Sequence, residues 1–329
     1  MEKIFLISFF LNFCFLIFHN KIFHCLNLYD YPNKIKKHRH KVSCTGGLLF
    51  LLNFLLIFLY YLIQDLDFLL NIFNSKKKII SFLISILLVF ILGLLDDKYN
   101  LEPKTKITSL IIIILISILI DESILINSLY FKNNYILHIE HFSIFFVLAS
   151  FLIFMNSFNM FDGINLQASL FFSFVMMMLL VKSGEVYFFL LILTPFLVIL
   201  YLNFQNKQFI GNSGSLLLSY IIGYFFLKFH GQISTLKVED ILLIILIPIY
   251  DTIRVVVIRL INKNKIFSGD NNHIHHILLK KLGLYKSIFI IQTLIIVPNV
   301  LSFFYLNLYF WIIISSLFYI TLIFTLDRK

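Results

Sequence analysis

Long apolar segments recur along the whole chain, and they constrain its fold more than any other feature. A helix needs about 20 apolar residues to cross roughly 30 Å of hydrocarbon. Hydrophobic residues make up 60% of the 329, which is more than a water-soluble domain of this size can bury, and the mean hydropathy is +0.94. Stretches that approach or reach the spanning length lie at roughly residues 3–18, 45–63, 79–95, 107–126, 142–155, 166–182, 186–203, 214–229, 239–260, 288–306 and 308–326. We therefore expect a polytopic, all-α integral membrane protein with about eleven transmembrane helices in one domain, residues 1–329.

The distribution of Lys and Arg predicts which side of the membrane each loop faces. With the loop after the first apolar stretch inside, the inner segments hold 19 of the 27 Lys and Arg residues and the outer segments hold 8. The run Lys76–Lys78 falls outside and goes against the rule. Inward-facing loops thus explain the net charge of +10 without a nucleic-acid partner, and their cations favour an anionic substrate.

Four polar motifs interrupt the apolar pattern, and the first is Asp96-Asp97 at the inner end of the third stretch. Adjacent carboxylates at a membrane boundary repel each other and are costly to desolvate, so they need a compensating cation such as a metal ion or a lysine. Mg²⁺ prefers hard oxygen ligands and often bridges a carboxylate to a substrate phosphate. The pair alone supports a metal site and a solvated helix end equally.

The second motif comprises Asn156, Asn159 and Asp162-Gly163 after the fifth stretch. Steps of three residues keep these side chains close on a helical surface. Amides can bind sugar hydroxyls or phosphate oxygens without adding charge. The alternative is a polar C-terminal cap in which Gly163 ends the helix.

The third motif, Gly211 to Ser215, immediately precedes an apolar helix. Small residues allow close approach of a ligand, and N–H groups at a helix start can hold a phosphate oxygen. Glycine and serine also make ordinary turns and caps, so this motif is weak by itself.

The fourth motif places Asp251 and Arg254 in the ninth stretch and then His273, His275 and His276 in the following basic loop. Three histidines in four positions beside cations indicate a metal site or a phosphate site. Zinc suits the ligand type, but no cysteine or second paired cluster accompanies the histidines, which favours phosphate. Histidine can donate hydrogen bonds to a diphosphate and move protons near neutral pH.

The order of these motifs resembles the polyprenyl-phosphate N-acetylhexosamine-1-phosphate transferase family (glycosyltransferase family 4), close to the bacterial undecaprenyl-phosphate N-acetylglucosamine-1-phosphate transferases. The resemblance runs from about Asp30 to His276. It is carried by Asp30, Pro32, Asn33, Lys36, His38, Gly46-Gly47, Asp96-Asp97, Asn156, Asn159, Asp162-Gly163, Asn203, Gly211 to Ser215, and His273-Ile274-His275-His276.

This resemblance implies transfer of an N-acetylhexosamine-1-phosphate from a UDP-sugar to undecaprenyl phosphate, giving the lipid-diphosphate-sugar and UMP. The implied setting is the bacterial inner membrane, with the active site facing the cytoplasm, Mg²⁺ as cofactor and Mn²⁺ as an alternative. The product would initiate a cell-envelope glycan, such as a cell-wall polymer or the lipopolysaccharide O-antigen. The implied partners are the two substrates and the lipid bilayer, and the resemblance also allows a homodimer.

The resemblance also assigns roles to individual residues. The implied catalytic residues are Asp96, Asp97, Asp162, His273, His275 and His276, and the implied metal ligands are Asp96, Asp97 and Asn212. The implied substrate-binding residues are Lys36, His38, Lys106, Asn156, Asn159, Asn203, Gly211, Ser215 and Arg254.

The chain departs from the family pattern at several positions. The family usually has aspartate at Asn212, and an amide is a weaker, uncharged ligand for Mg²⁺. Relatives commonly have Asp-Gly-Leu where this chain has Asn165-Leu166-Gln167, and an arginine near Asn271. A catalytically silent relative is therefore one alternative.

Two further alternatives concern the kind of protein. The related transferase for the peptidoglycan precursor normally has three consecutive histidines, a run that Ile274 interrupts here, favouring an N-acetylhexosamine donor. A secondary transporter would hold ionisable groups near the middle of its spans. The motifs of this chain lie at span ends on one side, which favours the transferase.

Overall fold

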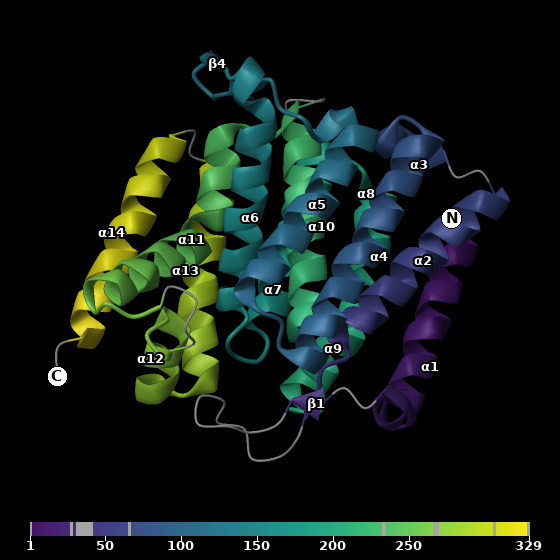
Figure 1. The fold of residues 1–329 in the computed structure, drawn as a ribbon, viewed down its shortest axis with the longest axis horizontal. Coiled ribbons are helices and arrows are strands. Elements are labelled where there is room, and N and C mark those ends of the chain that lie inside the picture. The colour runs from purple at the N-terminus through teal and green to yellow at the C-terminus, as the bar shows by residue number, and fades with distance from the viewer. Residues whose placement is uncertain are drawn as a thin grey trace.

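The protein is mostly helical in the computed structural model, which describes residues 2–26, 29–30, 42–64, 67–231, 235–265, 270–304 and 307–327. The helices are α1 (Glu2–Leu26), α2 (Gly46–Gln64), α3 (Asp67–Phe73), α4 (Lys76–Tyr99), α5 (Pro103–Ile120), α6 (Ser143–Phe161), α7 (Gln167–Ser183), α8 (Val186–Leu193), α9 (Phe196–Phe204), α10 (Gly211–Gly231), α11 (Val238–Ile261), α12 (Ile274–Leu282), α13 (Leu284–Phe304) and α14 (Leu308–Asp327). Two antiparallel hairpins pair β1 (Tyr29–Asp30) with β2 (Val42–Ser43) and β3 (Ser128–Tyr130) with β4 (Ile136–His138). Figure 1 shows one bundle, with the two chain ends toward opposite ends of it.

The helical, polytopic architecture predicted from the sequence is confirmed. Each of the eleven apolar stretches is helical over most of its described length, because a backbone in hydrocarbon must satisfy its hydrogen bonds internally. Within the described ranges, eight helical segments are long and apolar enough to cross a membrane, whereas the apolar helices at Gly46–Tyr61 and Gln167–Ser183 are shorter. The stretch at 186–203 is divided between α8 and α9 at Thr194-Pro195. The number of crossings stays a prediction.

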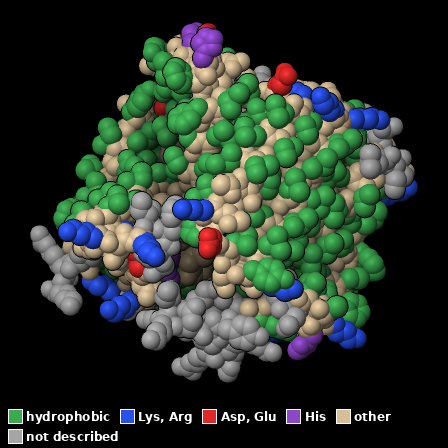
Figure 2. Space-filling view, in the orientation of Figure 1, with side chains coloured by type: hydrophobic (Ala, Val, Ile, Leu, Met, Phe, Trp, Pro, Cys, Tyr) green, Lys and Arg blue, Asp and Glu red, His purple; other side chains and the backbone are tan. Residues whose placement is uncertain are grey.

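Helix α10 forms the centre of the bundle. Every residue from Ser213 to His230 is buried, and α10 packs mainly against α4, α6 and α2. The rings of Phe82, Tyr224 and Phe225 pack together at this centre, with centroids 4.6 to 5.6 Å apart. Figure 2 shows hydrophobic side chains over much of the visible face, with most Lys and Arg side chains toward its upper and lower ends. A helix buried on all sides lies inside the bundle rather than against lipid.

Glycines let α2 and α4 approach the first turn of α10 very closely. A Cβ atom added to Gly93 of α4 would lie 2.3 Å from the Ser213 Cα, and one added to Gly47 of α2 would lie 2.6 Å from the Gly214 Cα. Membrane helices that pack by van der Waals contact use such small residues where their backbones meet. We call this end of the bundle, the lower end in Figure 1, the motif end.

A buried charge network lies at the opposite end. Asp121, which follows α5, accepts hydrogen bonds from the Tyr224 hydroxyl (2.5 Å) and the Ser123 hydroxyl (2.5 Å). Lys228 of α10 and Lys78 of α4 each place Nζ 3.4 Å from this carboxylate. A buried charge is tolerated only when it is paired and hydrogen-bonded, as Asp121 is.

We predict that Gly93→Ala separates α4 from α10. The added methyl group would meet Ser213 backbone atoms that cannot rotate away, so the expected loss of stability is about 1–3 kcal/mol. Gly231→Ala is the matched control, because its Cβ would lie 3.4 Å from the Ser123 carbonyl oxygen, an ordinary contact. Thermal unfolding in detergent measures both variants. An unchanged unfolding temperature for Gly93→Ala would contradict the close packing.

Candidate functional site

The predicted motifs come together at the motif end, although they lie far apart in the sequence. Contacts join the end of α4 to the start of α10, the end of α6 to α10 and to α12, and α11 to α12. Figure 1 shows the end of α9 and helix α12 at this same end. Lys36 and His38, with Pro32 and Asn33, lie outside the described residues.

Asp97 caps the first turn of α10. Its Oδ1 accepts a hydrogen bond from the Asn212 amide (2.8 Å), and its Oδ2 accepts one from the Ser213 amide (2.9 Å). Gly211 enters the helix at φ +75°, a conformation that favours glycine, and an added Cβ would lie 3.0 Å from Asp97 Oδ2. A carboxylate at a helix start satisfies free N–H groups and complements the helix dipole. The third motif therefore forms the N-terminus of a capped helix. The group that caps it is the Asp97 carboxylate of the first motif.

Asp96 has a lysine as its compensating cation. Lys106 of α5 places Nζ 2.8 Å from Asp96 Oδ2, and the Leu101 amide donates to Oδ1 at 3.1 Å. Asp96 is buried and Lys106 is largely so. The two neighbouring carboxylates therefore have different surroundings, one with a cation and the other with backbone amides.

The second motif connects α6 to α10. Asn159 Oδ1 accepts a hydrogen bond from the Ser215 hydroxyl (2.6 Å), whereas the Asn156 side chain donates to the Leu152 carbonyl of its own helix (2.8 Å). Asp162 is the C-terminal cap residue of α6. Gly163 lacks the positive φ of a helix-ending glycine, and an added Cβ would lie 1.9 Å from His275 Nε2. Glycine is needed here because the histidine ring packs against its Cα.

Asn203 holds two backbone segments in place. This buried residue near the end of α9 donates to the Gln208 carbonyl (2.7 Å), and its side-chain oxygen accepts from the Leu166 amide. Leu166 has φ +69°, a conformation that is costly for a branched side chain and needs such support. Asn203 therefore fixes the loop that follows Asp162.

Asp251 organises the histidine motif, and the sequence interpretation did not assign it a role. Its Oδ2 is 2.7 Å from His273 Nδ1, and its Oδ1 accepts from the Ile274 amide (3.0 Å) and from Arg254 (2.8 Å). Tyr319 of α14 also donates to Oδ1, at 2.9 Å. The sequence does contain a signal for this role, because Asp251 is a carboxylate within an apolar helix and lies three residues before an arginine.

His275 is a buried histidine at the motif end whose ring nitrogens make no hydrogen bond to the described chain. Its ring is fully buried, lies parallel to the His273 ring at 5.4 Å, and is 4.2 Å from the His276 ring. Burial, with the nearby His276, lowers the pKa of His275 well below its usual value, so its ring is neutral at pH 7.

Asp270 precedes this motif and is held by Arg259, whose Nε donates at 2.7 Å. Burial raises the pKa of Asp270, but the Arg259 and Asn272 hydrogen bonds outweigh it and leave the pKa below its usual value. Asp270 therefore stays ionised near the histidines at neutral pH.

The carboxylates at the motif end fit a divalent metal ion by donor chemistry. Each Asp97 oxygen accepts an amide hydrogen bond from the start of α10 and retains further lone-pair capacity. No three His, Cys, Asp or Glu side chains among the described residues already form a metal site. Mg²⁺ commonly uses only one or two carboxylates and completes its shell with water and substrate phosphate. The donor set matches that pattern.

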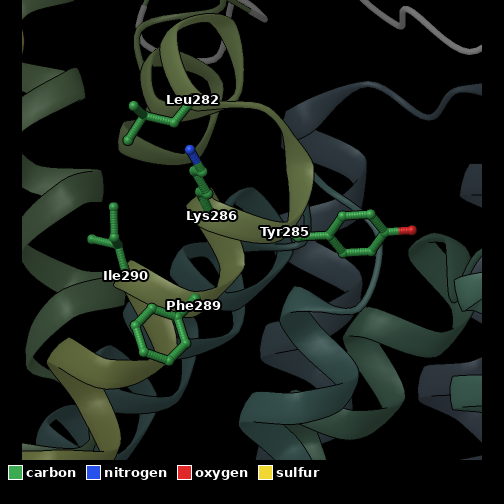
Figure 3. A pocket seen from close by; sticks show the side chains of 5 residues that line it. All are labelled: Leu282, Tyr285, Lys286, Phe289 and Ile290. Atoms are coloured by element: carbon green, nitrogen blue, oxygen red, sulfur yellow. The ribbon is translucent and has the colours of Figure 1, made fainter.

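One groove lies beside the predicted motifs rather than among them. It has a volume of about 530 Å³ and is lined by Leu282, Tyr285, Lys286, Phe289 and Ile290, near the junction of α12 and α13. In Figure 3 the Tyr285 ring points away from the other four side chains. None of the lining residues is a predicted site residue.

We predict that His275 makes stability fall with acidity. Because its pKa is lowered in the folded state, the unfolded chain takes up the proton first as pH drops below about 6.5, which costs up to about 1.4 kcal/mol per pH unit. No such loss is expected above that pH. In His275→Leu this part of the pH dependence should disappear, as measured by thermal unfolding at pH 7.5 and 5.5. The control His141→Leu changes an exposed histidine, and equal slopes in both variants would refute the prediction.

Comparison with known proteins supports the family resemblance seen in the sequence. The model of glycosyl transferase family 4 matches residues 79–230, slightly less than half of the chain. The undecaprenyl-phosphate alpha-N-acetylglucosaminyl 1-phosphate transferase of Thermotoga maritima is 29% identical over 92% of this chain and 91% of its own length. The enzyme of that name from Escherichia coli K12 is 26% identical over 85% and 77%. A probable transferase of this kind from Bacillus subtilis is 27% identical over 62% and 59%. The chain is thus a polytopic membrane protein whose residues 79–230 match the model of glycosyl transferase family 4.

Proposed function

We propose that this enzyme transfers an N-acetylhexosamine-1-phosphate from a UDP-sugar to undecaprenyl phosphate and releases UMP. The observation that carries the proposal is the meeting of Asp96-Asp97, Asn159, Asp162 and the histidine motif at one end of the bundle. The names of the relatives support N-acetylglucosamine as the sugar. The departures at Asn165 to Gln167 and Asn271 bear on the choice of sugar.

The reaction joins two anions, so charge neutralisation is its main requirement. An oxygen of the lipid phosphate forms a bond to the β-phosphorus of the UDP-sugar, and the bond from that phosphorus to the oxygen bridging the two phosphates breaks. The electron pair leaves with UMP. Positioned cations stabilise the charge that spreads over the phosphoryl oxygens. We assign Lys106 to the acceptor phosphate, and Arg254 with the histidine motif to the donor diphosphate or sugar.

Asp96, Asp97 and Asn212 would hold Mg²⁺, with Mn²⁺ as an alternative, and Asp162 would help to organise the nucleotide or the metal ion. When bound, the ion would neutralise phosphate charge between donor and acceptor. In this assignment the Asp97 carboxylate keeps its hydrogen bonds to α10 and offers its remaining lone pairs. One of the two carboxylates would also help to deprotonate the acceptor phosphate.

The cytoplasmic side of the bacterial inner membrane is the proposed location of the motif end. The distribution of Lys and Arg supports this orientation, since Lys98, Lys104 and Lys106 belong to the motif end together with Lys263 and Lys265 after α11 and Lys280 and Lys281 of α12. A lipid phosphate and a soluble UDP-sugar would then meet at one surface.

The first test measures UMP release by detergent-purified protein given undecaprenyl phosphate, Mg²⁺ and a panel of UDP-sugars. We expect lipid-dependent release with one N-acetylhexosamine donor, and loss of that release in Asp97→Asn. Asparagine keeps one acceptor for the α10 amides but turns an NH₂ group toward the other, so a stability loss of about 1–3 kcal/mol without unfolding is expected.

Glu140→Gln is the control for that test, because it removes an exposed acid at the opposite end of the bundle. Unchanged turnover in Asp97→Asn would refute the assignment of Asp97. Absence of release with every donor, from folded protein that binds the lipid phosphate, would instead support a catalytically silent relative.

A second prediction concerns Asn212. Replacing this amide by the carboxylate usual in the family adds a charged oxygen ligand, so Asn212→Asp should lower the Mg²⁺ concentration for half-maximal UMP release by about tenfold. A Mg²⁺ titration of both proteins checks this. Asn206→Asp is the control, since it makes the same change in the loop after α9. An equal Mg²⁺ requirement in the variant and the wild type would exclude residue 212 from the metal site.

A further inference from the structure

We propose that Tyr319 of α14 is a positioning residue that acts on His273 through Asp251. The inference rests on the proposed function only in assigning His273 to the substrate. Tyr319 lies outside residues 79–230, which match the family model, and beyond the last motif of the sequence resemblance. It is 4% exposed, so its hydroxyl is committed to interactions inside the protein.

The Tyr319 hydroxyl joins the two charged residues of α11. It donates to Asp251 Oδ1 at 2.9 Å and accepts from Arg254 Nε at 2.9 Å. A second Arg254 nitrogen, Nη2, donates both to Asp251 Oδ1 (2.8 Å) and to the Asn272 carbonyl (2.5 Å). The guanidinium therefore bridges α11 to the residue before His273, and Tyr319 fixes the remaining edge of that guanidinium.

The consequence for His273 follows from the two oxygens of Asp251. Three donors hold Oδ1, from Arg254, the Ile274 amide and Tyr319, so the carboxylate plane is fixed. Its Oδ2 then faces His273 Nδ1 at 2.7 Å. An ionised carboxylate can only accept, so Nδ1 must carry a hydrogen, and in the neutral ring Nε2 holds the lone pair. Such a partner fixes both the tautomer and the ring orientation.

Loss of the Tyr319 hydroxyl would release one edge of Arg254 and one donor to Asp251. The charged and titratable groups around His273 are Asp251 and Arg254 from α11, Asp270 from the preceding loop, His275 and His276 from α12, and Tyr319 from α14. Of these, Tyr319 is the group that can be changed to its deoxy form with the aromatic ring retained.

The test is Tyr319→Phe in the full-length protein, read by solid-state NMR of ring-¹⁵N-labelled histidine in lipid bilayers. The His273 signals are identified by their absence in His273→Gln. We expect wild-type His273 to carry hydrogen on Nδ1, and Tyr319→Phe to move its nitrogen shifts toward a mixture of tautomers. UMP release should fall about tenfold in kcat, with KM for the UDP-sugar changed less than twofold.

Ser316→Ala is the matched control, because it removes a hydrogen bond from the same helix to α11, from the Ser316 hydroxyl to the Tyr250 hydroxyl (3.1 Å). It should leave both the His273 spectrum and kcat unchanged. An equal effect of Ser316→Ala, or an unchanged His273 spectrum in Tyr319→Phe, would overturn the proposal. A changed spectrum in a protein that releases no UMP with any donor would uphold the positioning role and reject the proposed function.

Discussion

The hydrogen bonds from the start of α10 to Asp97 determine how the motif end is assembled. They require α4 to end where α10 begins, and the glycines at 47, 93 and 214 allow this approach. Once α10 is placed, its Ser215 reaches Asn159 and fixes the end of α6. The loop that follows α6 then carries Gly163 against His275. One capped helix start thus links the positions of all four motifs.

Two of the buried charge networks in the bundle, at Asp121 and at Asp251, have different consequences. At the opposite end, Asp121 is fully engaged by Tyr224, Ser123 and lysines, which is the condition for a buried charge to be tolerated. At the motif end, both oxygens of Asp251 also have hydrogen-bond partners. Asp251 positions a histidine motif in which the buried His275 ring has no hydrogen-bond partner in the described chain. A buried polar group left unsatisfied costs about 1–3 kcal/mol, and such costs are characteristic of functional sites.

The sequence predicted the helices well because hydrocarbon leaves the backbone few alternatives. It predicted the division at Thr194-Pro195, the short helices α3 and α12 and the two hairpins poorly, since these depend on tertiary contacts. The run Lys76–Lys78 opposed the expected charge pattern for a local reason, because Lys78 lies 3.4 Å from the buried Asp121 carboxylate. The order of the motifs predicted which residues would lie together at one end of the bundle. The capping of α10 by Asp97 and the hydrogen bonds that converge on Asp251 depend on tertiary packing, so the sequence did not predict them.

A site for two phosphate-bearing substrates is most readily built at helix ends. In the middle of a bilayer every polar group must find a protein partner, so few remain for a ligand. At a helix end, backbone N–H and C=O groups lack intrahelical partners, and side chains such as Asp97 and Asp251 can bind them and still retain lone pairs. Asp251 does this for α12 while also holding His273. The residues that close the helix ends are therefore the same residues that can orient groups toward a charged substrate.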